Sequence, residues 1–114
     1  MLAGDDRLRQ DSIQSENELK KYMEGLKSRQ FKTKFFLVNI LIELGMGWHS
    51  LKEIKKFAVE RGVSVSHLFE NLLELCHRSN FLETDFKEKY YPRLTSFKIR
   101  DEAFPLLRNI LQET

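Results

Sequence analysis

The stretch SLKEIKKFAVERGVSVSHLFENLLELCHRSN, residues 50–80, contains two segments with helical periodicity and a glycine-containing turn between them. In each segment the apolar side chains recur every three or four residues, which places them on one face of an α-helix. Gly62 lies between the segments and can adopt the left-handed conformation that ends a helix. Two helices separated by only a short turn indicate a helix-turn-helix unit.

Polar residues that favour the start of a helix precede both segments. Ser50 is followed three residues later by Glu53, which is the spacing of a capping box. The second helix has two candidate N-caps, Ser64 and Ser66, and we expect it to end near Ser79.

A further helix is expected upstream, in residues 15–30. Ser15 and Glu18 have the spacing of another capping box, and apolar residues then follow at helical intervals. These residues form a single apolar stripe: Leu19, Tyr22, Met23 and Leu26. Residues 1–14 are polar and show no periodicity, so we expect a disordered polar tail there.

The stretch FFLVNILIEL, residues 35–44, is apolar at eight of its ten positions. It predicts a helix over about residues 32–44 that ends at Gly45 or Gly47. A helix that is apolar all round must be covered on every side. Either the N-terminal helix covers it, or a second copy of the chain packs against it; we expect a homodimer. The expected dimer interface consists of Leu19, Tyr22, Met23 and Leu26.

The C-terminal part has the pattern of a hairpin followed by a helix. A short strand is expected at residues 81–83, then the charged loop TDFKEKYYPR at 84–93, then the alternating strand LTSFKIR at 94–100. Asp101 is the expected cap of the last helix, with Pro105 in or near its first turn.

This order of elements resembles the winged-helix superfamily of DNA-binding proteins. RLTSFKIRDEAFPLL, residues 93–107, looks like the returning wing strand and last helix of compact prokaryotic regulators of the repressor type. The resemblance covers about residues 35–111. It implies a mainly α fold with a small β-hairpin: a winged helix-turn-helix domain in residues 31–114, preceded by an extra helix at 15–30 for dimerisation or covering.

The resemblance also implies a function, that of a small dimeric transcriptional regulator that binds double-stranded DNA. The recognition helix would span about residues 64–79 and lie in the major groove, while residues 84–93 would form the wing. Asn71 would be suited to an adenine edge. The residues implied in DNA contact are Ser50, Lys52, Lys55, Ser66, His67, Asn71, Lys87, Lys89, Tyr90 and Arg93.

The distribution of charge leaves a second function open. Glu70 and Glu74 lie on the expected recognition helix, where carboxylates oppose binding to phosphate. The same face would suit a basic protein partner, so the alternative function is a winged-helix interaction module in a larger assembly, without DNA binding. Residues 20–34 carry six cations and one carboxylate, a net charge of +5, which forms either a phosphate-contacting surface or a solvated helix face.

Composition and motifs exclude several other classes of protein. The 114 residues are 41% hydrophobic and 32% charged with a net charge of +2, which fits one small globular domain. Cys76 is the single cysteine, and we find neither a secretory signal nor an apolar run of membrane-spanning length, so we expect a cytoplasmic protein. The spacing of polar residues gives no catalytic set, phosphate-binding loop or metal site. We therefore expect no enzymatic activity, cofactor or metal.

Overall fold

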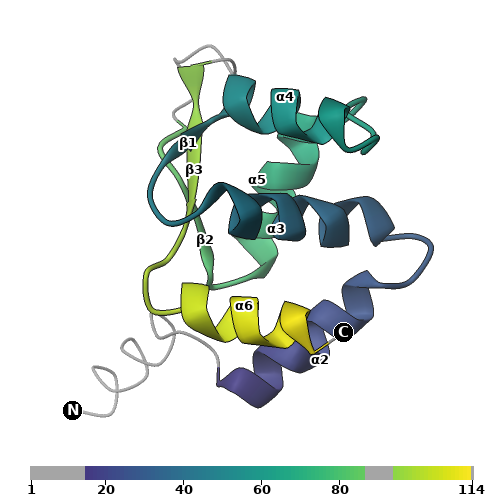
Figure 1. Cartoon of the computed structure of the whole chain (residues 1–114), viewed down its shortest axis with the longest axis vertical. Coiled ribbons are helices and arrows are strands. Elements are labelled where there is room, and N and C mark those ends of the chain that lie inside the picture. Colours follow the sequence, from purple (N-terminus) through teal and green to yellow (C-terminus); the bar gives the residue numbers. More distant parts are fainter. Residues whose placement is uncertain (1–14, 87–93, 114) are drawn as a thin grey trace.

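The computed structural model describes residues 15–86 and 94–113, which form five helices and a three-stranded sheet (Figure 1). The elements are α2 (Glu16–Leu26), α3 (Lys32–Leu44), β1 (His49–Ser50), α4 (Leu51–Glu60), α5 (Leu68–Arg78), β2 (Leu82–Thr84), β3 (Ser96–Ile99) and α6 (Phe104–Gln112). The expected tail at 1–14 and the greater part of the expected wing, residues 87–93, lie outside the described residues. The chain is thus mainly helical with a small antiparallel sheet.

Helix α3 begins and ends where the sequence predicts, whereas α2 begins as expected but ends at Leu26, four residues before the expected limit at residue 30. The Ser15 hydroxyl accepts a hydrogen bond from the Glu18 backbone N–H at 3.2 Å, and the Glu18 carboxylate accepts one from the Ser15 N–H at 3.0 Å. This capping box is confirmed. Helix α3 ends at Gly45, whose φ of 101° is disfavoured for residues with a side chain.

The start of α4 is confirmed, but the start of α5 is not where we expected it. The Ser50 hydroxyl accepts a hydrogen bond from the Glu53 N–H at 3.1 Å. Helix α5 begins only at Leu68, and its N-cap residue is His67, whose side chain makes no capping hydrogen bond. The prediction that Ser64 or Ser66 caps α5 is wrong, because both residues lie in the turn before the helix, where the Ser64 hydroxyl accepts a hydrogen bond from the Ser66 N–H at 3.4 Å.

The expected cap of the last helix is also wrong. Helix α6 begins at Phe104 after Ala103, which provides no side-chain cap. The Asp101 carboxylate instead lies 3.5 Å from the Lys98 ammonium group, three residues earlier in the chain. Pro105 does lie in the first turn, where its missing N–H costs no helical hydrogen bond.

The sheet has the strand order β1-β3-β2, and both strand pairs are antiparallel. The hairpin of β2 and β3 was predicted, although both strands differ from the expected ranges by one or two residues at their ends. Strand β1 was not predicted. It pairs His49 with Phe97 and Ser50 with Ser96, so it connects the start of α4 to the hairpin.

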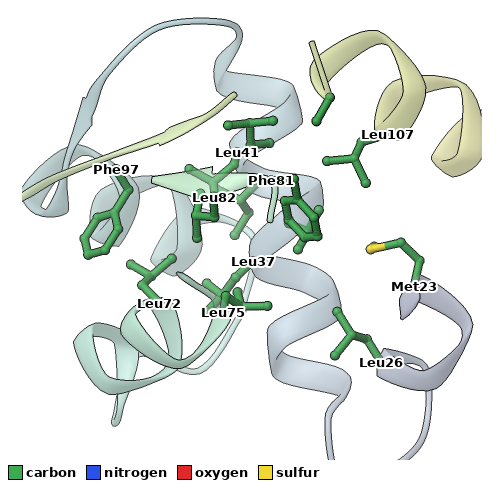
Figure 2. Packing of buried hydrophobic residues seen from close by; sticks show 14 of the residues in the cluster. Met23, Leu26, Leu37, Leu41, Leu72, Leu75, Phe81, Leu82, Phe97 and Leu107 are labelled. Atoms are coloured by element: carbon green, nitrogen blue, oxygen red, sulfur yellow. The ribbon is translucent and has the colours of Figure 1, made fainter. Parts of the chain in front are cut away.

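Helix α3 lies at the centre of the core, with α4 on one side and α2 and α6 on the other (Figure 1). Figure 2 shows Leu37 and Leu41 of α3 among side chains from the other layers, including Leu75 of α5 and Phe81 just before β2. All four of these residues are at most 1% exposed. The chain itself therefore covers the inward faces of the apolar helix, while Phe36 remains 38% exposed on its outer side.

Helix α2 contributes three of the four expected dimer-interface residues to this core. Leu19 is 0% exposed, Met23 is 1% and Leu26 is 5%, because α2 packs against both α3 and α6. The fourth residue, Tyr22, is half-buried, and its ring lies edge-on to Phe81 at a centroid distance of 5.7 Å. The structure therefore assigns Leu19, Met23 and Leu26 to intrachain packing, so these side chains offer no free surface to a second copy.

Candidate nucleic-acid interface

The outward face of α5 carries the residues expected to read DNA. His67, Glu70 and Glu74 are exposed and Asn71 is half-buried, and the spacing of three or four residues places them along one side of the helix. Ser66 is exposed in the turn just before them. The opposite side of α5 packs into the core through Leu68, Leu72 and Leu75. The structure thus brings together all the expected contact residues of this helix.

The two carboxylates of this face differ in their surroundings. The Glu74 carboxylate lies 2.7 Å from the Lys34 ammonium group of α3, whose side chain is only 13% exposed. The hydrogen bond from Lys34 lowers the pKa of Glu74 below its ordinary value, so this carboxylate is charged and paired at neutral pH. Within the described part of the chain Glu70 has no ion-pair partner. The objection that carboxylates repel phosphate therefore applies to Glu70 and much less to Glu74.

Helix α4 provides the clearest group of free cations. Lys52, Lys55 and Lys56 are exposed, and none of them forms an ion pair with another residue in 15–86 or 94–113. Their spacing of three and four residues places them on one side of α4. We define these three residues as the α4 lysine cluster. Ser50, the N-cap of α4, lies two residues before Lys52, and its hydroxyl is already the acceptor for the Glu53 N–H.

The basic segment at 20–34 is partly neutralised within the chain. Three of its six cations face carboxylates: Lys20 lies 3.2 Å from Glu113, Lys27 lies 2.9 Å from Glu24, and Lys34 pairs with Glu74. These pairs leave this segment with less free positive charge than its sequence indicates. The described geometry of residues 20–34 therefore does not favour a continuous phosphate-binding surface.

The sequence reasoning missed Lys56 as a member of the α4 lysine cluster. The signal was present, because Lys56 follows Lys52 by four residues and so shares its side of the helix. The expected wing residues Lys87, Lys89, Tyr90 and Arg93 lie outside the described residues.

No family model, curated protein or solved structure matches the chain. Its function has to be inferred from the chemistry of its own surface.

Two features bear on a reactive or metal site within residues 15–86 and 94–113: the thiol of Cys76 and the grouping of acidic and histidine side chains. Burial raises the pKa of the Cys76 thiol to about 12, so the thiol is neutral and a poor nucleophile at physiological pH. In the residues that the structure describes, no three His, Cys, Asp or Glu side chains are grouped closely enough to hold a metal ion. Across the same residues, none of the helices combines the length and apolar character needed to cross a bilayer.

Proposed function

We propose that the chain is a winged helix-turn-helix protein that binds double-stranded DNA and acts as a small transcriptional regulator. The order of the elements supports this proposal. Helix α3, strand β1, helices α4 and α5, and the β2–β3 hairpin follow one another, and β3 lies between the other two strands. Helices α4 and α5 are joined by a turn in which Gly62 has a φ of 71°.

The α4 lysine cluster is the observation that carries the proposal. Three ammonium groups without carboxylate partners among the described residues lie on one side of the helix that precedes α5. The positive end of the α4 dipole lies at Ser50 and adds to their field. In this proposal the cluster binds backbone phosphates, while Ser66, His67 and Asn71 approach the bases or the adjacent phosphates.

The salt dependence of binding to duplex DNA tests this assignment. Each phosphate contact that is lost should lower the slope of log affinity against log salt by about 0.9, so replacement of all three lysines should lower it by up to about 2.7. The measurement is the fluorescence anisotropy of a labelled duplex between about 50 and about 200 mM salt. The test variant carries Lys52→Gln, Lys55→Gln and Lys56→Gln.

The matched control removes the same number of charges at the other end of the molecule, on α2, at its C-cap and on α6 (Figure 1). It carries Lys20→Gln, Lys27→Gln and Arg108→Gln, and its slope should stay close to that of the unchanged protein. Equal losses in both variants would mean that only net charge matters, and the α4 assignment would be wrong. Absence of salt-sensitive binding at about 50 mM salt would refute DNA binding altogether.

A protein-interaction module is the second candidate function. It is favoured by Glu70, which is exposed on α5 without a cationic partner in the described part of the chain, and by the exposed apolar side chains of Met46 and Trp48, which are 54% and 50% exposed. Homodimerisation also belongs to the proposal, since one such module offers only a small interface with DNA. Its interface would use a surface other than the buried stripe of α2, and sedimentation velocity at tens of micromolar measures whether a dimer forms.

A further inference from the structure

A groove of about 620 Å³ lies between α2, the start of α3 and the C-terminal half of α5. Its volume is within the range of roughly 300–1,000 Å³ that is typical of small-molecule sites. The groove is separate from the α4 lysine cluster, because none of its lining residues belongs to α4. Of its lining residues Glu74 also lies on the outward face of α5, but neither of the functions proposed above assigns a ligand contact to it.

The charged residues of the groove favour an anion. Lys21, Lys34 and Arg78 line it together with a single carboxylate, Glu74, so the lining has a net charge of +2. Lys34 already compensates Glu74 at 2.7 Å. Lys21 and Arg78 are exposed and have no ion-pair partner in the described residues; Arg78 has only a longer-range attraction to Glu74, so both cations can contact a ligand directly.

Apart from Gly25 and the polar side chain of Gln30, the remaining lining is aromatic and aliphatic. Tyr22 and Leu26 of α2 contribute to it, and Phe31, which is 37% exposed, lies at the other side. The Phe31 ring is also 5.5 Å from the Lys34 ammonium group. Burial raises the pKa of the Tyr22 phenol, so its hydroxyl keeps its proton at neutral pH and can donate a hydrogen bond. A ligand that fits this lining therefore needs an apolar ring as well as an anionic group.

We propose that this groove binds a small organic anion, of the class of aromatic carboxylates, with its ring against Tyr22 and Phe31 and its carboxylate at Arg78 and Lys21. The planar guanidinium of Arg78 can donate two parallel hydrogen bonds to a carboxylate. The Lys34–Glu74 pair stays intact, so the ligand does not have to break an existing ion pair.

Gly25 provides a direct way to block the groove. It belongs to the lining, and a Cβ atom at this position would meet nothing within 4 Å. The Cβ of a larger residue is therefore accommodated, so Gly25→Leu should extend an apolar side chain into the groove, and Gly25→Ala, which adds one methyl group, is its matched control. Both changes remove a glycine from the last turn of α2, which favours the helix.

The experiment is an NMR titration of the full chain, labelled with ¹⁵N, with 2-naphthoate as the probe. We expect the backbone amide signals of the groove residues to shift and those of α4 to stay in place. The affinity should fall about tenfold in Arg78→Gln, because a hydrogen bond to a charged group is lost, and should be unchanged in the control Arg108→Gln. Gly25→Leu should abolish the shifts and Gly25→Ala should retain them.

Two further probes test the chemistry of the ligand. The neutral analogue 2-naphthylmethanol should bind about tenfold more weakly than 2-naphthoate, since it cannot accept charge-assisted hydrogen bonds from the Arg78 guanidinium as a carboxylate does. Acetate has the negative charge without the aromatic ring, so at the same concentration it should leave the amide signals of the groove residues in place. The proposal is overturned if 2-naphthoate leaves the groove signals unchanged, binds folded Gly25→Leu as well as the unchanged protein, or has the affinity of 2-naphthylmethanol.

Discussion

Replacement of Leu19 by alanine tests whether α2 is part of the monomer core. Leu19 is 0% exposed on the face of α2 that packs against α3 and α6. The change removes three carbon atoms, each contributing about 0.8 kcal/mol of transfer free energy, or about 2.4 kcal/mol together. A cavity term adds to this, so we expect a loss of about 3 kcal/mol in the free energy of unfolding, within the usual span of roughly 2–5 kcal/mol for buried leucines.

The expected loss is large enough to measure by thermal unfolding. For a domain of this size about 3 kcal/mol corresponds to a fall in Tm of roughly 10–20 °C, which circular dichroism of the helical signal will follow. Leu94→Ala is the matched control: it is the same chemical change at a side chain that is 64% exposed, and it should alter stability by less than about 0.5 kcal/mol.

The oligomeric state separates the two interpretations of α2. If Leu19 belongs to intrachain packing, Leu19→Ala lowers Tm and leaves the sedimentation profile of the folded protein unchanged at tens of micromolar. A shift from dimer to monomer with little loss of Tm would refute the reasoning, because it would place Leu19 in an interface between two copies.

Three further predictions concern the helix termini and the cysteine. Ser50→Ala should lower the free energy of unfolding by about 1 kcal/mol through loss of the α4 cap, while Ser66→Ala, which caps no helix, should change it by less than about 0.5 kcal/mol; urea unfolding measures both. Gly62→Ala should cost about 1–2 kcal/mol in the same assay, because φ is 71° at this position; no loss would mean that the turn can rearrange. Burial raises the pKa of Cys76 from about 9 to about 12, so the folded state favours the protonated thiol and its stability falls as the pH rises through this interval. Cys76→Ala should show a smaller fall in the free energy of unfolding above about pH 9, and equal falls in both proteins would contradict the assigned cause.

Helix boundaries that depend on nearby residues could be predicted from the sequence. The reciprocal hydrogen bonds of Ser15 and Glu18 span three residues, and Gly45 ends α3 through its own backbone conformation. The predicted N-caps of α5 and α6 were wrong for a related reason. A serine or aspartate before a helix has several local partners, and the chain used Ser64 in a turn and Asp101 in an ion pair with Lys98.

Features that depend on distant residues were not predictable in the same way. Strand β1 has only two residues, too few for an alternating pattern, and it forms because Phe97 and Ser96 lie opposite it. The apolar pattern of α3 required a cover on every side but did not say whether the cover came from the same chain. The same holds for the charges of the candidate interface: the lysines of α4 share a face by spacing alone, whereas the partner of Glu74 is Lys34, forty residues earlier.

The pairing of early and late elements has a consequence for how the chain folds during translation. Strand β1 finds its partner in β3, and α2 packs on α6, the last helix of the structure. Both contacts close long loops, which slows folding, since loop-closure entropy is lost before the contacts form. During synthesis the apolar faces of α2 and α3 therefore emerge before α6, and the face of α2 that packs on α6 stays uncovered until α6 has been made.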